Sequence, residues 1–125
     1  MQKFVFFFLL LCVQMPLASA QLSSDRWNFT YHPFKGQYEV YGGVLGDMQA
    51  PVEGNKKIAF KIDAAAARHM FEAMGPDTKD ACSGEAGERT RIKDRLICTR
   101  SRRGAYNCYF GFDLATGKSI GGQIC

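Results

Sequence analysis

Four cysteines carry the chemistry that this sequence could support: Cys82, Cys98, Cys108 and Cys125. A cysteine can act as a thiolate nucleophile, bind a metal ion or form a disulfide. No two of the four stand in a C-x2-C or similar close pair, and the chain has only two histidines, so a zinc site fits poorly. The choice between free thiols and disulfides depends on where the protein resides.

The first twenty residues, MQKFVFFFLLLCVQMPLASA, have the order of a secretory signal peptide. Lys3 provides the positive start, an apolar run follows from residue 4 to 13, and Ala18-Ser19-Ala20 is a cleavage site of small residues. The run is too short to span a bilayer, and no second apolar segment follows. We therefore expect one exported domain over residues 21–125, periplasmic or secreted, with no membrane span after the signal is removed.

The fifth cysteine, Cys12, lies within the expected signal, so an even number remains, which in an exported chain favours two disulfides. In the stretch CTRSRRGAYNC, residues 98–108, a hairpin centred at Arg103 would place Cys98 directly opposite Cys108. Opposed residues on antiparallel strands lie about 4.5–5.5 Å apart between Cα atoms, within disulfide range. By elimination Cys82 would bond Cys125, although the rival pairing of Cys82 with Cys98 and Cys108 with Cys125 stays open.

No other residue pattern predicts catalysis. His32 lies in a turn and His69 on a helix, each more typical of a surface position than of a catalytic base. Glu85 and Glu88 could supply the two carboxylates of a glycoside hydrolase, but a polar loop in so small a domain offers no cleft. The glycine-rich stretches match neither a P-loop nor a dinucleotide pattern. We expect no enzyme, no cofactor and no metal, with a small hydrolase as a remote alternative.

Alternating apolar residues predict strands over 26–32, 37–47 and 56–62. A helix over 64–74 follows, with Asp63 as its N-cap and Gly75-Pro76 at its end. A polar loop over 76–88 leads into two strands, 89–101 and 106–114, joined by a turn, and 119–125 is a last short strand. This order predicts an α+β domain: an antiparallel sheet of about five to six strands with one helix packed on it, braced by disulfides.

Basic residues gather on the predicted strand 89–101 and the turn after it. Only Lys3 of the 16 basic residues lies in the signal, which leaves 15 against 12 acidic residues, too mild an excess to indicate a nucleic-acid ligand. Seven of these 15 fall between residues 89 and 103, four of them alternating on one strand face. Such a face can be simply solvated, with its charges preventing the strand edge from pairing with another chain, or it can be a contact surface for anions. With Tyr109, they are the candidate binding residues: Arg89, Arg91, Lys93, Arg95, Arg100, Arg102 and Arg103.

These observations predict a non-enzymatic binding protein, most plausibly an inhibitor or immunity-type partner of another envelope or secreted protein. Arginine and tyrosine are frequent anchors of protein interfaces, and clustered positive charge speeds association with an acidic partner. An alternative is a module that binds an anionic polysaccharide or lipid headgroup of the envelope through residues 89–103. Steep loss of affinity with salt would favour this alternative.

Overall fold

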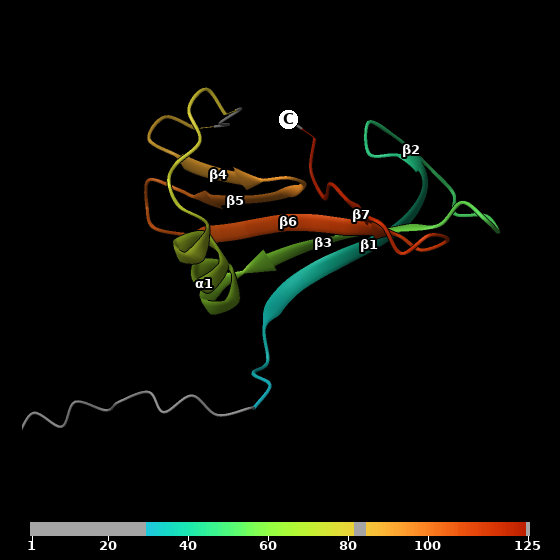
Figure 1. Cartoon of the computed structure of the whole chain (residues 1–125), viewed down its shortest axis with the longest axis horizontal. Coiled ribbons are helices and arrows are strands. Elements are labelled where there is room, and N and C mark those ends of the chain that lie inside the picture. Colours follow the sequence, from blue (N-terminus) through green and yellow to red (C-terminus); the bar gives the residue numbers. More distant parts are fainter. Residues whose placement is uncertain (1–29, 82–84, 125) are drawn as a thin grey trace, which may run out of the picture. The chain divides into compact units, whose positions relative to one another are not determined.

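A computed structural model describes residues 30–81 and 85–124 of the chain (Figure 1). The signal peptide, Cys82 and Cys125 lie outside the described residues, as does most of the predicted strand 26–32. Residues 30–32, the described part of that strand, are not in a strand. Among the described residues, no helix is long and apolar enough to cross a membrane.

One antiparallel sheet and one helix form the fold, which confirms the predicted α+β class. The sheet has seven strands in the order β2-β1-β3-β6-β5-β4, with β7 beside β6. The number exceeds the expected five to six because β2 was not predicted and the predicted strand 89–101 is divided into two. The elements are β1 (Lys35–Val44), β2 (Asp47–Gln49), β3 (Lys57–Asp63), α1 (Ala64–Met74), β4 (Arg89–Lys93), β5 (Leu96–Arg100), β6 (Tyr106–Asp113) and β7 (Ser119–Ile120).

The helix occupies the predicted residues but begins differently. Asp63 makes no side-chain cap bond, and the turn out of β3 is made by Ala64, whose φ of 55° lies in the left-handed region. Four consecutive alanines, strong helix formers, then propagate the helix, and its apolar stripe places Ala67, Phe71 and Met74 in the core. Asp63 is the N-cap residue and both ends of the helix are as predicted, but the Asp63 carboxylate does not make the expected cap bond.

The predicted strand 89–101 is two strands joined by a tight turn. Asp94 has a φ of 52°, and Lys93 pairs with Leu96, so the chain reverses at Asp94-Arg95. This reversal changes which side chains share a face, because Arg91 now lies directly opposite Cys98. This turn was not predicted, because Asp-Arg is not one of the glycine-containing pairs that are typical of two-residue hairpin turns.

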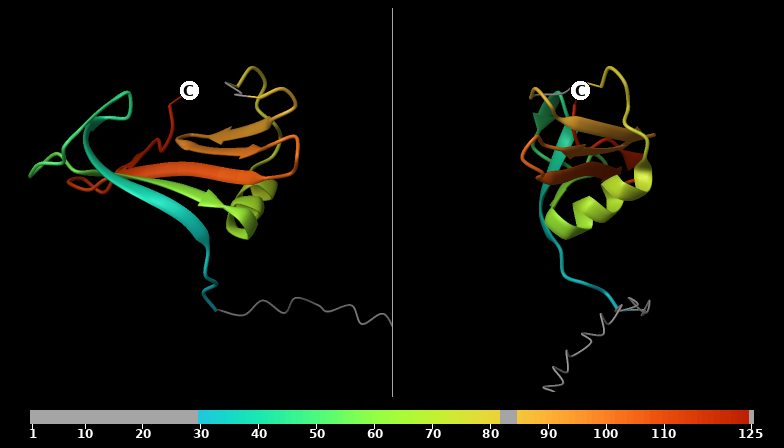
Figure 2. Two further views of the ribbon diagram at one scale, coloured as in Figure 1. Left: turned by 180° about the vertical axis from the view of Figure 1, so that it is seen from behind. Right: turned by 90° about the vertical axis from the view of Figure 1, so that its left-hand side faces the viewer.

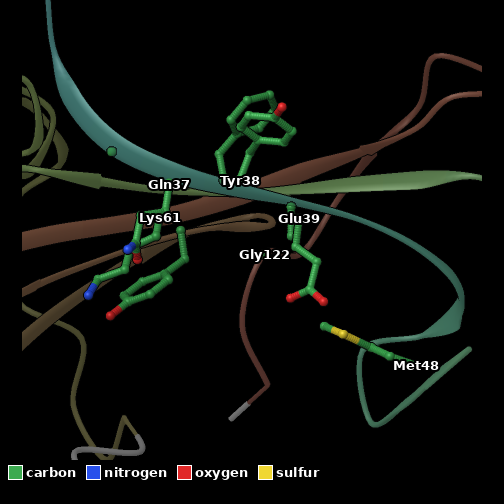
Figure 3. Close-up of a pocket in the computed structure, with 10 residues that line it drawn as sticks. Gln37, Tyr38, Glu39, Met48, Lys61 and Gly122 are labelled. Carbon is green, nitrogen blue, oxygen red and sulfur yellow. The ribbon is translucent and has the colours of Figure 1, made fainter. Parts of the chain in front are cut away.

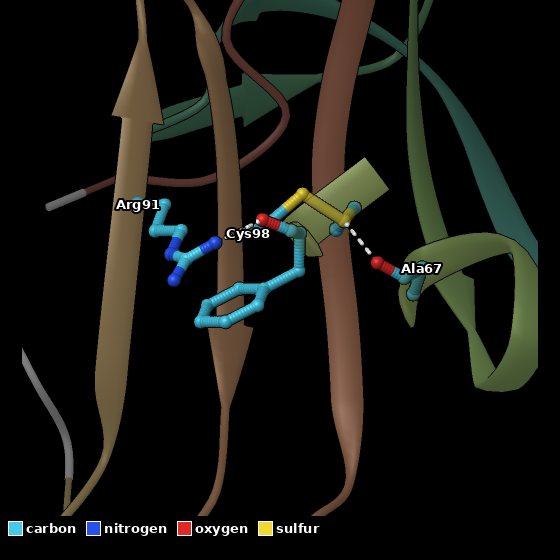
Figure 4. Close-up of a disulfide and its surroundings, with 5 residues drawn as sticks. Ala67, Arg91 and Cys98 are labelled. Atoms are coloured by element: carbon cyan, nitrogen blue, oxygen red, sulfur yellow. Dashed lines mark hydrogen bonds between the residues drawn. A yellow bond between two sulfur atoms is a disulfide. The ribbon is translucent and has the colours of Figure 1, made fainter. Parts of the chain in front are cut away.

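The core lies between α1 and one end of the sheet (Figures 1 and 2). Cys98 and Cys108 pair across β5 and β6 and are bonded to each other, which confirms the predicted disulfide and leaves no room for the rival pairing (Figure 4). Both cysteines are fully buried under the helix. The Cys108 sulfur, which carries no hydrogen in a disulfide, lies 3.4 Å from the Ala67 carbonyl oxygen. We call the sheet surface that packs on α1 the helix face.

On the opposite face the last described residues run against β6. A Cβ built on Gly122 would lie 2.4 Å from both the backbone nitrogen and the oxygen of Phe110, so only glycine fits there. Tyr41, the residue before the segment of β1 that pairs with β2, is only 2% exposed. Burial raises the pKa of the Tyr41 hydroxyl.

Candidate functional site

The structure separates the seven predicted basic residues into three groups. The first group, Arg89 and Arg91, points to the helix face and pairs with Asp77 in the loop after α1. Their Nε atoms lie 2.7 and 2.8 Å from the two carboxylate oxygens, and these bonds hold the pKa of Asp77 down at about 2, below its ordinary 3.8. These two residues are therefore engaged within the protein.

Arg91 is the more deeply placed of this pair, with 14% of its side chain exposed. Its guanidinium donates a 2.7 Å hydrogen bond to the carbonyl oxygen of Phe71 and lies 4.2 Å from the centre of the Phe71 ring (Figure 4). It thus satisfies a carbonyl near the end of α1 and covers a core aromatic ring. Arg91 ties α1 to β4.

The second group lies at the turn between β5 and β6. Ser101 and Gly104 close this turn with a 2.9 Å backbone hydrogen bond, and Gly104 has the left-handed φ of 86° that such three-residue turns require. Arg102 and Arg103 are exposed at its tip. Arg100 is half-buried, and its Nε donates to the Tyr106 hydroxyl at 3.1 Å. The tip therefore presents two cations to solvent.

The third group, Lys93 and Arg95, flanks the β4–β5 turn at the other end of β5, and both residues are exposed. Arg89 and Lys93 are four residues apart on β4, which corresponds to about 13 Å along a strand. The four charges predicted to share one strand face are thus separated: Arg89 and Arg91 pair with Asp77, whereas Lys93 and Arg95 lie at the β4–β5 turn.

Tyr109 lies on the opposite face, away from the arginines. It lines an open pocket of about 590 Å³ together with Gln37 and Glu39 of β1 and Lys61 of β3 (Figure 3). Burial, with smaller effects of Asp63 and Glu88, raises the pKa of the Tyr109 hydroxyl. An amide, a carboxylate and an ammonium group around a shallow surface can bind polar groups, but they form no nucleophile–base pair.

The sequence did not reveal a partly exposed apolar surface on the helix face of the sheet. Beyond the end of α1, the helix face continues over β1, β3 and β6 as a sheet of apolar side chains that we call the aromatic face. Phe60 stacks on Phe110 at 5.2 Å between ring centres and tilts against Tyr38 at 6.4 Å, while Phe110 meets Phe112 edge-on at 6.2 Å. The aromatic face comprises Tyr38, Val40, Ile58, Phe60, Phe110 and Phe112.

A length argument could have found this surface. An 11-residue helix is about 16 Å long, whereas β6, with eight residues, extends about 26 Å. One helix therefore cannot cover the alternating aromatic residues of 106–114. Accordingly Tyr38 is 71% exposed, Val40 38% and Phe112 37%.

Within the described ranges, no three His, Cys, Asp or Glu side chains are grouped so that they could hold a metal ion. Comparison with protein-family models, with curated proteins and with solved structures found no match to this chain. The chemistry of its surfaces therefore carries the functional argument alone.

Proposed function

We propose that this protein is a small exported binding protein without chemistry of its own, an inhibitor or immunity-type partner of another envelope or secreted protein. The observation that carries the proposal is the aromatic face. Large contiguous apolar patches on soluble proteins often mark interaction sites, and aromatic side chains are enriched where protein interfaces are buried. Because the rings are attached to a regular sheet, they should lose little conformational entropy on binding.

The charges beside this face indicate what kind of partner fits. Tyr38, Phe60 and Phe110 occupy paired positions on three neighbouring strands. The same row continues across β5 through Leu96, which pairs with Lys93 at the edge strand. Lys93 and Arg95 therefore border the rings on one side. A partner with an apolar centre and an acidic rim would complement both features.

The arginine tip supports a second candidate function. Arg102 and Arg103 are exposed beyond the helix-covered end of the sheet, separate from the aromatic face. Arginine pairs in a bidentate manner with phosphate and carboxylate groups, so this tip fits an anionic polysaccharide or lipid headgroup. Two exposed cations form a small electrostatic site, and we rank it second.

Capture from the native envelope fraction at low and high salt tests the proposal, with three forms of the protein: wild type, Phe112→Ser and Val52→Ser. Val52 is an exposed apolar residue that is not a member of the aromatic face, so it serves as the matched control. We expect one stoichiometric protein partner that survives high salt and whose affinity falls about tenfold or more with Phe112→Ser alone.

Two results would contradict this assignment. Equal partner affinity for all three forms would show that the aromatic face is not part of the interface. If only polysaccharide or lipid is recovered, and if it is lost at high salt, the second candidate function, anion binding by the arginine tip, would be favoured instead.

A further inference from the structure

One half of β1 has an open edge. β2 pairs with β1 only at Gly42, Gly43 and Val44, whereas β3 pairs with it from Lys35 to Tyr41. On the side away from β3, no described residue pairs with the segment 35–40, and all six of its residues are exposed (Figure 1). An exposed strand edge with unpaired backbone groups can serve as a template for another strand.

The backbone groups at this edge can be assigned. The Lys61 carbonyl oxygen lies only 2.7 Å from where a Gly36 Cβ would be, so this carbonyl points toward β1. Its pairing partner Gln37 then directs its own N–H and C=O toward β3. Since these directions alternate along a strand, Gly36, Tyr38 and Val40 direct theirs to the open edge.

Segment 34–40 is complementary to itself when it is paired antiparallel about Gln37. Lys35 then meets Glu39 of the second copy, and Glu39 meets Lys35, so two opposite-charge pairs form on the face opposite α1. On the helix face Tyr38 pairs with Gly36, beside the Phe34 ring that already lies over this glycine within one copy. Phe34 meets Val40, and both are exposed in one copy. Opposite charges, aromatic–glycine and apolar pairs all favour strand pairing.

Backbone geometry selects the same register. Outward-directed residues must face outward-directed residues, which allows Gly36 to pair with Tyr38 and permits shifts only in steps of two residues. A shift one way places Lys35 opposite Gln37, and a shift the other way places it opposite Tyr41. Only the register about Gln37 pairs both charges.

We propose that β1 binds β1 of a second copy of this chain, antiparallel and centred on Gln37, to form a two-fold symmetric dimer with one continuous sheet. The two-fold axis is perpendicular to the sheet, so both helices and both aromatic faces lie on the same side. The dimer goes beyond the proposed function and does not depend on it, because the strand edge and the charge pairs on the other face belong to the dimer alone. Tyr38 and Val40 of the aromatic face border the dimer contact, whereas Phe112 does not.

Disulfide trapping tests the register directly. Gln37 lies on the two-fold axis in a non-hydrogen-bonded pair, for which the Cα atoms are about 4.5 Å apart, within disulfide range. We expect Gln37→Cys, expressed from the full chain and exported, to form a covalent dimer under mild oxidation. Glu39→Cys alone should stay monomeric, while a mixture of Glu39→Cys and Lys35→Cys should cross-link. Wild type measures the background from the native cysteines.

Charge exchange tests the same contact without new cysteines. In Lys35→Glu or Glu39→Lys, both charge pairs become repulsive, and we expect the dimer dissociation constant measured by sedimentation velocity to rise about tenfold. The double variant, with unchanged net charge, should restore it, while Lys118→Glu, a distant control, should leave it unchanged. Cross-linking of Gln37→Cys no faster than wild type, or no rescue by the double variant, would overturn the proposal. Phe112→Ser, which tests the partner site, should leave dimerisation intact.

Discussion

Arg91 makes both polar and apolar contacts that connect α1 to β4. Its guanidinium satisfies the Phe71 carbonyl and the Asp77 carboxylate while its plane lies over the Phe71 ring. Arginine keeps its charge under all relevant conditions, so the aspartate is the member of this cluster that responds to acid. The cluster should therefore loosen only when Asp77 is protonated.

Replacing Asp77 with Asn tests this view. The folded-state pKa of Asp77, about 2, lies below its ordinary 3.8. A lowered folded-state pKa contributes stability that is fully present above the ordinary pKa and is lost as the pH falls toward the folded value. Asp77→Asn should therefore unfold at a lower urea concentration than wild type at neutral pH, and the difference should disappear as the pH approaches 2.

Glu72→Gln is the control for this experiment. Glu72 also has a lowered pKa, from its hydrogen bond with Arg68, but both residues lie exposed on one helix and link no two elements. We expect a smaller change in the urea midpoint. An equal midpoint change in the two variants would show that Asp77 does not hold α1 to β4.

At the level of elements, the sequence predicted helices, strands and pairings best where a pattern extended over many residues or depended only on neighbouring residues. The alternation in β3, the apolar stripe of α1 and the opposed Cys98 and Cys108 each determine a structure within one or two neighbouring segments. The β4–β5 turn was missed because Asp94 takes a left-handed φ without a glycine beside it. That error placed Arg89, Arg91 and Lys93 on the wrong face, because reversing the chain after Lys93 changes which side chains share a surface with Leu96 and Cys98.

The short strand β2 has too few residues to show a periodic pattern, so the sequence could not reveal it. The last strand was predicted over 119–125, but only Ser119–Ile120 form it. The exposed tip at Arg102 and Arg103 was predicted, because turn residues and charge coincide there. The aromatic face was not, because its exposure depends on how far the helix reaches and not on any single motif.

Gly122 gives a prediction at this scale. Alanine at this position would place its Cβ 2.4 Å from the Phe110 backbone, which cannot yield without disturbing β6. We expect Gly122→Ala to lower the free energy of unfolding by about 1–3 kcal/mol, as overpacking does. Faster hydrogen exchange of the β6 amides should accompany this loss.

Gly121→Ala is the matched control, since its nearest neighbour would be an ordinary 3.6 Å away. Urea denaturation of both variants checks the prediction. Equal stabilities would mean that residues 121–124 do not pack on β6 in solution.

At the scale of the whole molecule, we expect positive charge to speed association with the partner and the aromatic rings to slow dissociation of the complex. The chain carries a formal net charge of +4, and Lys93 and Arg95 lie beside the aromatic face. Interface-rim charges of this kind affect mainly the association rate and its salt dependence. Rings buried in the contact affect mainly dissociation.

Reversing both charges, Lys93→Glu with Arg95→Glu, should slow association with the captured partner about tenfold at low salt and change the dissociation rate little. The salt dependence of association should weaken at the same time. Lys56→Glu with Lys118→Glu makes the same change of net charge away from this border and should have a smaller effect. Stopped-flow or surface-binding kinetics would measure both rates, and equal slowing by the two double variants would reduce the effect to net charge alone.

The pairing of β3 with β6 has a consequence for how the chain folds. These strands are neighbours at the centre of the sheet, yet α1, β4 and β5 separate them in sequence. The disulfide spans only ten residues inside the β5–β6 hairpin, so it stabilises a contact that is already local. Joining the two halves of the sheet still requires closure of a long loop, and such closures slow folding. The meander β4–β5–β6 is therefore expected to form early, and the docking of β1 and β3 onto it to set the folding rate.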